Sequence, residues 1–240
     1  MPAVFEKDYY LRTSDFDCKG RLKPSCLLEL FQNVAGEHAV LLGCGYNDLA
    51  PRRLMWVILR TKYRIYADCS LHDTVHLRTW PCPPSRVGFR REYLVTDLKG
   101  SVVAKGSSEW ALVDAESRRL AVGERAYPEG LDFCTEQSLP GRMERLRPFE
   151  GEELMLIKPG YSRIDVNGHV NNTAYADFAL DAAAPVLSGR IESFQIDYRH
   201  ELRQGCSVQL CGKEEEGSLL ICGRDENGEV SFICKMVQGS

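Results

Sequence analysis

Two hydrophobic patterns follow one another in the first half of the chain. An apolar stripe at helical spacing comes after Pro24 and contains Leu27, Leu30, Phe31, Val34, Ala35, Leu41 and Leu42. Pro24 and Ser25 suit a helix start, because proline is tolerated at the first helical position and serine can cap backbone N–H groups. Segments rich in β-branched and aromatic residues then predict strands at 55–66, 74–80, 89–97 and 102–114.

The second half repeats this order around an Ala-rich helix. A stripe at i, i+3, i+4 and i+7 predicts the helix, with Tyr175, Phe178, Ala179 and Ala182 on its apolar face. The candidates for its N-cap come directly before the stripe, at Asn171, Asn172 and Thr173. Strand patterns follow at 193–199, 207–211, 218–224 and 229–237. Each half therefore reads as one strand, one helix and then a run of antiparallel strands.

Short sequence matches indicate that the two halves are copies. Residues 13–22 read TSDFDCKGRL and residues 161–170 read YSRIDVNGHV, so Asp17 matches Asp165 at an offset of 148 (165 − 17). Asp-x-x-Gly turns recur at 97–100 and 225–228. A period this long indicates a duplicated domain. We predict an α+β fold with domains at 1–125 and 152–240, joined by a proline-containing linker at 126–151.

Composition restricts the function classes. Apolar residues make up 44% and charged residues 27%, as in soluble globular proteins, and a net charge of −4 argues against nucleic-acid binding. No apolar run is long enough to insert in a membrane, and the first residues resemble neither a secretory signal nor a transit leader, so we expect a cytoplasmic protein. The ten cysteines are dispersed without a CxxC pair, so we expect reduced thiols and no metal site.

Three polar residues stand at alternate positions before the second helix: Asp165, Asn167 and His169. In an extended segment, residues two apart share a face, so the three side chains would converge. The helix start would add unpaired N–H groups and a partial positive charge. This combination suits a reaction in which a carbonyl oxygen becomes negative. The alternative is an Asx-rich turn that only caps the helix.

The first-half copy of this motif has different chemistry. Lys19 and Arg21 stand where the second copy has Asn167 and His169. Neither cationic side chain can accept a proton at neutral pH or act as a neutral amide donor. We therefore expect one active site per chain, in the C-terminal half, with the N-terminal half free to hold substrate.

In order and spacing, nearly the whole chain resembles the acyl-acyl carrier protein thioesterases, enzymes with two fused hot-dog domains. The most specific pieces are D-x-N-x-H within IDVNGHVNNTAYADF, the segment YRHE that ends at Glu201, and MWVILR from Met55 onward. The resemblance implies two tandem hot-dog domains, each a long helix wrapped by a curved antiparallel sheet. It also implies a catalytic set of Asp165, Asn167, His169 and Glu201. Many members have Cys after that Glu, but this chain has Leu202, which argues against a cysteine nucleophile here.

The implied reaction is hydrolysis of the thioester bond of a fatty acyl-acyl carrier protein, which releases free fatty acid and ends chain elongation. Glu201 would activate water as general base, Asn167 and helix amides would polarise the carbonyl, and Asp165 would fix the Asn167 amide. The choice between His169 and Glu201 as proton acceptor stays open. The implied partner is an acyl carrier protein with a phosphopantetheine-linked acyl chain, no cofactor is implied, and a homodimer is a further candidate assembly.

Two expectations concern substrate recognition. Arginine clusters would attract an acidic carrier, at Arg52 and Arg53, Arg90 and Arg91, and Arg142, Arg145 and Arg147. The N-terminal half would choose acyl chain length, because it keeps a long apolar helix and a strand with the candidate substrate-binding residues Met55, Trp56 and Ile58. Such a pocket discriminates by filling, so the preference should be graded.

Other functions fit parts of the same pattern. An acyl-CoA thioesterase is the nearest alternative, and a hot-dog hydratase would instead add water to an enoyl thioester. Free thiol with an intact acyl chain would indicate hydrolysis, whereas a 3-hydroxyacyl thioester would indicate hydration. A non-catalytic acyl-binding module would show no turnover. A Cys/His/Asn nucleophilic arrangement, for instance with Cys206, is the remaining enzymatic alternative.

Overall fold

A computed structural model describes residues 3–86, 88–121 and 126–239, and the chain divides into two compact units. Unit 1 contains Met1–Ser14 and Glu29–Arg142, and unit 2 contains Asp15–Leu28 and Met143–Ser240. These units differ from the expected domains, because residues 15–28 go with the second unit and the expected linker is divided between both. Residue 125, where the first domain was expected to end, lies outside the described residues.

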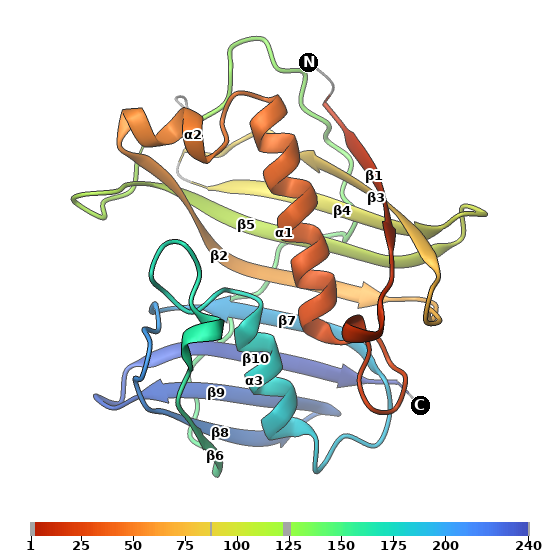
Figure 1. Cartoon of the computed structure of the whole chain (residues 1–240), viewed down its shortest axis with the longest axis vertical. Coiled ribbons are helices and arrows are strands. Elements are labelled where there is room, and N and C mark those ends of the chain that lie inside the picture. Colours follow the sequence, from red (N-terminus) through yellow and green to blue (C-terminus); the bar gives the residue numbers. More distant parts are fainter. Residues whose placement is uncertain (1–2, 87, 122–125, 240) are drawn as a thin grey trace. The chain divides into compact units, whose positions relative to one another are not determined.

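Unit 1 is an antiparallel sheet with a helix across one face (Figure 1). Its strands lie in the order β1-β3-β4-β5-β2. Their bounds are Phe5–Tyr10 (β1), Leu54–Ile65 (β2), Thr74–Pro81 (β3), Phe89–Asp97 (β4) and Val102–Asp114 (β5). The helix α1 spans Pro24–Leu41, so it begins one residue before the Ser25 that was expected as its cap, and it enters unit 1 at Glu29. A short helix α2, Tyr46–Leu49, and a 3-10 turn at Ala50–Arg52 lead into β2.

A glycine lets α1 pack closely on this sheet. Gly106 of β5 lies in register between Tyr63 of β2 and Tyr93 of β4. Phe31 of α1 covers it, stacked on Tyr93 with ring centroids 4.2 Å apart and edge-on to Tyr63 at 6.2 Å. A Cβ atom on Gly106 would approach the Phe31 ring to 2.3 Å, so a larger residue cannot fit without moving that ring. The inner face of the sheet is therefore the one that carries Tyr63 and Tyr93.

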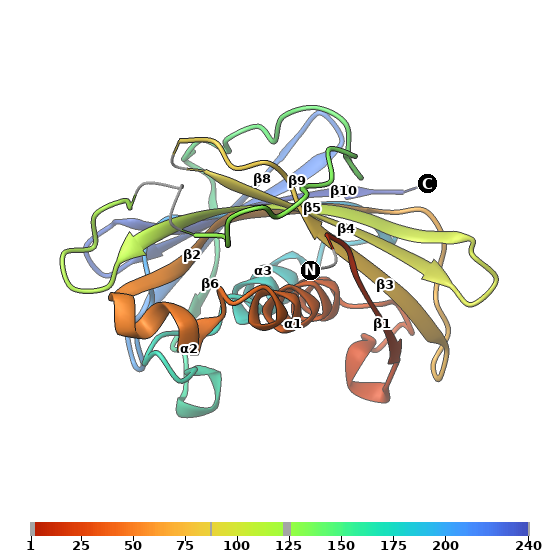
Figure 2. The same cartoon turned by 90° about the horizontal axis from the view of Figure 1, so that it is seen from above.

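Unit 2 repeats the arrangement, with the helix α3 across one face of its sheet (Figure 2). The strand order is β6-β8-β9-β10-β7. The bounds are Glu152–Ile157 (β6), Ile191–Tyr198 (β7), Val208–Glu215 (β8), Ser218–Asp225 (β9) and Val230–Gln238 (β10). The helix α3 spans Ala174–Ala183, and all four residues of its predicted apolar stripe are buried. The equivalent strand order in both units confirms the internal repeat and the α+β fold.

Matching turns also recur in the two units. In unit 1 the Asp97 carboxylate accepts the backbone N–H groups of Lys99 and Ser101, both at 2.8 Å. In unit 2 the Asp225 carboxylate accepts two N–H groups in the same way. The glycine that follows has a positive φ in each turn, 87° at Gly100 and 78° at Gly228, a conformation that favours glycine.

The expected linker is hydrogen-bonded to buried ionic groups in each unit. In unit 1, Arg90 pairs with Glu92 and donates to the carbonyl oxygens of Leu139 (2.8 Å) and Gly141 (2.7 Å). The N–H of Ser138 donates to Glu92 at 3.0 Å. Burial raises the pKa of Glu92, and the Arg90 guanidinium opposes that rise. This stretch of the linker therefore lies on the sheet face opposite α1.

Hydrogen bonds of the same kind hold the linker in unit 2. The N–H of Leu146 donates to Asp197 at 3.1 Å, and Gln195 donates to the carbonyl oxygen of Glu144 at 2.6 Å. Arg199 donates to the carbonyl oxygen of Leu146. The Leu146 side chain packs against Cys222 and Ile233. We call residues 138–146 the strap, since 138–141 are hydrogen-bonded to unit 1 and 144–146 to unit 2.

Two global expectations can be compared with this fold. None of the helices in the described ranges is long and apolar enough to cross a membrane. All ten cysteines are free thiols, and six of them are buried. Burial raises the pKa of Cys44, Cys69 and Cys82 to about 11, so these thiols stay protonated near neutral pH.

Candidate active site

The D-x-N-x-H segment is a tight turn, so the expectation of an extended strand was wrong. It follows a 3-10 turn at Tyr161–Arg163, and an isolated bridge between Ile164 and Val170 closes it. The N–H of Asp165 donates to the carbonyl oxygen of His169 at 2.8 Å. The N–H of Gly168 donates to the carbonyl oxygen of Asp165 at 3.0 Å, with Gly168 at φ 78°. Chain reversal, rather than alternation along a strand, groups these polar residues.

Asp165 holds Asn167 in this turn. One carboxylate oxygen accepts the backbone N–H of Asn167 at 2.8 Å, and the other lies 3.4 Å from its side-chain Nδ2. The Asn167 amide nitrogen carries two hydrogens, so one remains to donate to a ligand. Asn167 is exposed to solvent. An Asx turn is therefore present, as in the alternative interpretation, but it does not explain the contact between His169 and Glu201 beside it.

That pair joins His169 to Glu201. The Nε2 atom of His169 lies 3.0 Å from Oε2 of Glu201, although 32 residues (201 − 169) separate them. The His169 side chain is 15% exposed and the Glu201 side chain 45%. A backbone bond beside the pair brings the two segments together, from the N–H of Val170 to the carbonyl oxygen of Leu202 at 2.8 Å. The carboxylate is thus open to water and ligands on one side and held by the imidazole on the other.

Sequence reasoning missed the contribution of Tyr175. Its hydroxyl accepts the N–H of Leu202 at 2.9 Å, next to Glu201 in the chain. Burial raises the pKa of Tyr175 well above the usual tyrosine value, so the hydroxyl stays neutral. Tyr175 was recognised only as one position of an apolar helical stripe, since a stripe does not reveal a contact 27 residues away.

Two N–H groups at the start of α3 are hydrogen-bonded within the chain. The N–H of Thr173 donates to the Asn171 side-chain oxygen at 2.9 Å, and the N–H of Ala174 donates to the Asn171 carbonyl oxygen at 2.9 Å. Asn171, one of the three N-cap candidates, therefore takes up these two donors. This leaves the Asn167 amide as the better placed donor for a carbonyl oxygen.

The first copy of the motif folds alike but has a structural contact in place of a His–Glu pair. The Asp17 carboxylate accepts the N–H groups of Lys19 and Arg21, each at 2.8 Å. The Lys19 ammonium donates to the carbonyl oxygen of Leu187 at 3.2 Å, and Arg21 donates to that of Gly189 at 2.6 Å. Both cations thus bind carbonyl groups just beyond α3, where positive charge is favourable. We call this contact the basic clamp.

The candidate substrate-binding residues of β2 do not share one face. Trp56 and Ile58 point to the same face because they are two positions apart, whereas Met55 points to the other. The Trp56 indole donates to the carbonyl oxygen of Cys44 at 2.9 Å, and its ring lies edge-on to Phe89 at 4.8 Å. The structure therefore brings Trp56 and Ile58 together on an aromatic-rich face and separates Met55 from them.

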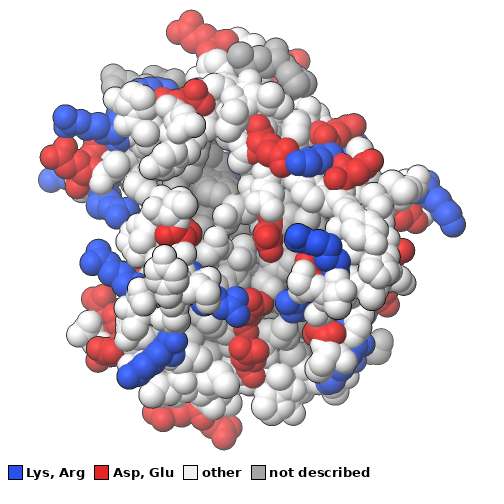
Figure 3. All heavy atoms as spheres, in the orientation of Figure 1, with Lys and Arg blue, Asp and Glu red and all other residues white. Residues whose placement is uncertain are grey.

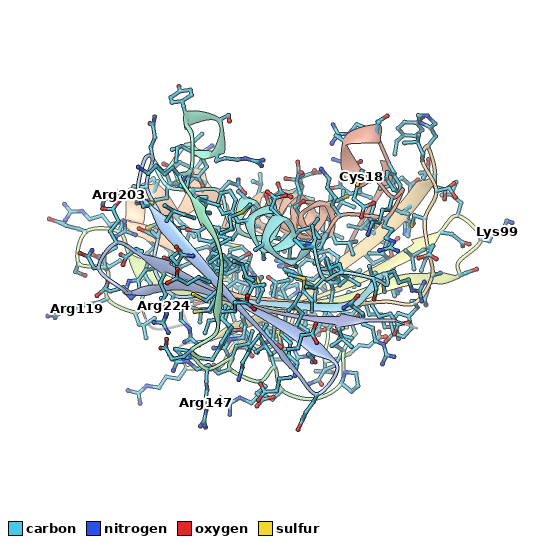
Figure 4. All side chains as sticks on the ribbon, turned by 90° about the horizontal axis from the view of Figure 1, so that it is seen from below. Cys18, Lys99, Arg119, Arg147, Arg203 and Arg224 are labelled. Carbon is cyan, nitrogen blue, oxygen red and sulfur yellow. The ribbon has the colours of Figure 1, made fainter. Side chains whose placement is uncertain are left out.

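The arginine clusters differ in their accessibility. Arg91 is only 5% exposed, with its guanidinium against His38 and Thr79, and Arg90 is held by the strap. The expectation that Arg90 and Arg91 form a surface patch was therefore wrong. Arg145 and Arg147 are exposed and line an open groove of about 700 Å³ in unit 2. Figure 4 shows Arg147 on the side of the unit 2 strands away from α3.

Comparison with solved structures shows which class of fold the chain has. Each unit is one helix across an antiparallel sheet, and the fold as a whole is that of double hot-dog thioesterases. An acyl-ACP thioesterase from Bacteroides thetaiotaomicron superposes with a TM-score of 0.91 at 22% identity, covering 99% of this chain and 98% of that one. The 12:0-ACP thioesterase from Umbellularia californica superposes with a TM-score of 0.87 at 21% identity, covering 100% of this chain and 98% of that one.

The chain belongs to the acyl-ACP thioesterase family. The family model of the N-terminal domain matches residues 2–125 and that of the C-terminal domain matches residues 147–235. The chloroplastic oleoyl-acyl carrier protein thioesterase of Coriandrum sativum is 27% identical over 195 residues, which is 73% of this chain and 53% of that protein. The chloroplastic oleoyl-acyl carrier protein thioesterase 1 of Arabidopsis thaliana is 24% identical over 220 residues, which is 83% of this chain and 61% of that protein. The chain thus spans little more than half the length of these relatives.

Proposed function

We propose that this protein hydrolyses the thioester bond of a fatty acyl-acyl carrier protein and releases the free fatty acid, which ends chain elongation. The observation that carries the proposal is the 3.0 Å pair of His169 and Glu201 beside an Asn167 amide held by Asp165. Family membership supports the substrate class, because the relatives are named for acyl-acyl carrier protein thioesterase activity.

Water is the proposed nucleophile, with Glu201 as its base. The carboxylate takes a proton as the water oxygen forms a bond to the thioester carbon. Collapse of the tetrahedral intermediate then breaks the carbon–sulfur bond, and the proton passes to the leaving thiolate to give free thiol. General-base assistance of this kind contributes about 10²–10⁴ in rate. His169 holds the Glu201 carboxylate in place, and Leu202 supplies no competing nucleophile.

The developing oxyanion is assigned to Asn167. Its second amide hydrogen would donate to the thioester oxygen, and one donor placed in this way is worth about 10²–10³ in kcat. Asp165 keeps the amide from rotating, because it engages both the backbone and the side chain of Asn167. Asp165 is thus a positioning residue and Asn167 a catalytic one.

Unit 1 is the proposed binding site of the acyl chain. Trp56 and Ile58 share the face of β2 that carries the aromatic cluster with Phe89, Leu112 and Tyr127. An apolar chain that enters there would be removed from water at about 0.8 kcal/mol per buried methylene. Met55 lies on the opposite face and is therefore withdrawn from this role.

Turnover measurements test the reaction. Acyl-acyl carrier protein and acyl-CoA substrates of graded length are incubated with the protein, and free thiol, fatty acid and 3-hydroxyacyl products are quantified. We expect free thiol and fatty acid, with the carrier-protein substrates preferred. A 3-hydroxyacyl product would identify a hydratase, and absence of turnover with every substrate would refute the proposal.

A single substitution tests the base. Glu201→Gln keeps the shape of the side chain but cannot accept a proton, so kcat should fall about 10²–10⁴-fold. Glu215→Gln is the matched control, since Glu215 is an exposed β8 residue paired with Lys213. Thiol-blocking reagents should leave turnover unchanged. Near-normal activity of Glu201→Gln, or an acyl group trapped on Cys206, would refute the water mechanism.

Arg145 and Arg147 are the proposed contacts for the acidic carrier protein. Both are exposed in the unit 2 groove, which Glu144 and Glu229 also line, and charges of both signs are interspersed on the face seen in Figure 3. Reversing both charges should lower kcat/KM for the carrier-linked substrate most strongly at low salt and leave acyl-CoA hydrolysis unchanged, because exposed charges are screened by salt. Lys99→Glu, an exposed change in a hairpin, is the control. Equal losses for both substrates would contradict this docking surface.

A further inference from the structure

Glu201 lies in a segment without strand pairing. The strand β7 ends at Tyr198, and residues 199–203 form no regular element. The N–H groups of Arg199 and His200 both donate to the carbonyl oxygen of Ser231. Beyond that point, both polar groups of the Leu202 backbone are hydrogen-bonded, and the Arg203 carbonyl oxygen accepts the N–H of Cys206 at 3.4 Å. The position of Glu201 therefore depends strongly on what holds Leu202.

Two hydrogen bonds hold Leu202, one at each of its backbone polar groups. Its carbonyl oxygen accepts the N–H of Val170 at 2.8 Å, which fixes the segment against the turn that carries His169. Its N–H donates to the Tyr175 hydroxyl at 2.9 Å, which fixes the same segment against α3. The Leu202 side chain is 3% exposed, so the anchored residue is buried while Glu201 beside it faces outward.

We propose that Tyr175 is a positioning residue that sets the distance between Glu201 and His169. This inference rests on the proposed function, in which that pair activates water. Tyr175 is itself rigid. It is 3% exposed and its ring lies edge-on to Tyr198 at 5.6 Å and to Phe232 at 5.2 Å. A buried, tightly packed acceptor gives the Leu202 N–H one fixed partner.

Loss of the hydroxyl should act through geometry. A buried N–H without an acceptor is unfavourable, so the 199–203 segment would shift to find water or another acceptor. Glu201 would move with it, away from His169. A displacement of about 1 Å at a catalytic group can cost roughly 10²-fold in rate. Substrate affinity should change little, because the hydroxyl contacts the backbone of the protein.

The test compares two tyrosines that lie against each other. Tyr175→Phe removes the acceptor of the Leu202 N–H and keeps the ring. Tyr198→Phe is the matched control, since that ring packs edge-on against Tyr175 but its hydroxyl donates to the carbonyl oxygen of Asn172 at 3.1 Å. With an acyl-acyl carrier protein substrate, we expect Tyr175→Phe to lower kcat about 10- to 100-fold with KM nearly unchanged. Tyr198→Phe should keep the wild-type kcat.

A double-mutant cycle separates positioning from general destabilisation. In a Glu201→Gln background, Tyr175→Phe should cause no further loss of kcat, because its effect passes through Glu201. The His169 imidazole resonances should shift in Tyr175→Phe and stay unchanged in Tyr198→Phe. Additive losses, equal effects of the two Phe variants or an unshifted His169 signal would each overturn the proposal.

One measurement needs no variant. In the wild-type protein the Leu202 amide should exchange with solvent much more slowly than the amide of Gln204, an exposed residue, and equal exchange rates would overturn the proposal even if Tyr175→Phe failed to fold. The proposed function fails separately, if the wild-type protein does not hydrolyse acyl thioesters. In that case the His169 shift would still report whether Tyr175 sets the geometry of the pair.

Discussion

Substitution by alanine should have opposite effects on stability at Gly106 and at Gly36. A Cβ at Gly106 would lie 2.3 Å from the Phe31 ring, whereas one at Gly36, an exposed position of α1, would have no atom within 4 Å. Gly106→Ala should therefore destabilise the protein, because Phe31 is confined between Tyr63 and Tyr93. Gly36→Ala should stabilise it, because alanine has the higher helix propensity.

The magnitudes follow from these contacts. Ordinary van der Waals contact begins at 3.4 Å, so the ring must move by about 1.1 Å (3.4 − 2.3) to admit the methyl group. Overpacking a core costs about 1–3 kcal/mol, and each aromatic pair that is disturbed is worth a further ~0.5–1.5 kcal/mol. We expect Gly106→Ala to lower the free energy of unfolding by about 2–4 kcal/mol. Gly36→Ala should raise it by about 0.5–1 kcal/mol.

Tryptophan fluorescence in urea measures both effects. Trp56, Trp80 and Trp110, the three tryptophans of the chain, all belong to unit 1, so their signal reports the unit that contains Gly106 and Gly36. In a thermal melt, each kcal/mol should correspond to about 2–4 °C.

A second substitution tests the cause. Phe31→Leu removes the ring edge that the new methyl group meets, so the double variant with Gly106→Ala should be more stable than the sum of the two single losses predicts. Strict additivity would show that the methyl group and the ring do not meet. A Gly106→Ala protein as stable as the wild type would refute the packing argument altogether.

Two further predictions concern specificity and acid stability. Ile58→Ala should shift the preferred acyl chain toward greater length, by about 10- to 200-fold in kcat/KM per methylene. Met55→Ala, on the other face of β2, should leave the preferred length unchanged. Both variants are measured with substrates of graded length, and a shift in both or in neither would contradict the assignment. The N–H groups of Ser101 and Lys99 lower the pKa of Asp97 below 3.8, so its contribution to stability is present above that pH and is lost as the pH falls through the lowered value. When the urea concentration at the unfolding midpoint is plotted against pH, Asp97→Asn should therefore lose less stability at acid pH than the wild type. Parallel curves for the wild type and Asp97→Asn would argue against this contribution of Asp97.

The regular elements could be predicted because their signals are local. The strands β4 and β5 have the predicted bounds, and α1 begins within one residue of the predicted cap Ser25. Long periodic runs of apolar residues leave few alternatives, and the duplication supplied each element twice. The hot-dog resemblance implied a helix wrapped by a curved antiparallel sheet in each half, and the order of strands comes from the structure.

The details of the site depended on contacts that no local pattern contains. Alternating polar residues look alike in a strand and in an Asx turn, so the segment from Asp165 to His169 was assigned the wrong backbone. Adjacent arginines suggest an exposed patch, but Arg91 is buried because its strand faces α1. Tyr175 and Leu202 both looked like ordinary core residues, since a hydrophobicity pattern cannot show a hydrogen bond between a tyrosine hydroxyl and a backbone N–H.

The basic clamp has a consequence for the order of synthesis. Unit 2 is built from two stretches of chain, and its early stretch, Asp15–Leu28, leaves the ribosome long before the carbonyl groups that Lys19 and Arg21 bind. From residue 28 to residue 187 the ribosome adds 159 residues (187 − 28), which takes roughly 8–32 s at about 5–20 residues per second. During that interval the two cations have no acceptor and the first turns of α1 have no unit to join. A gene cut within the strap would give two products, and neither would contain a whole unit 2.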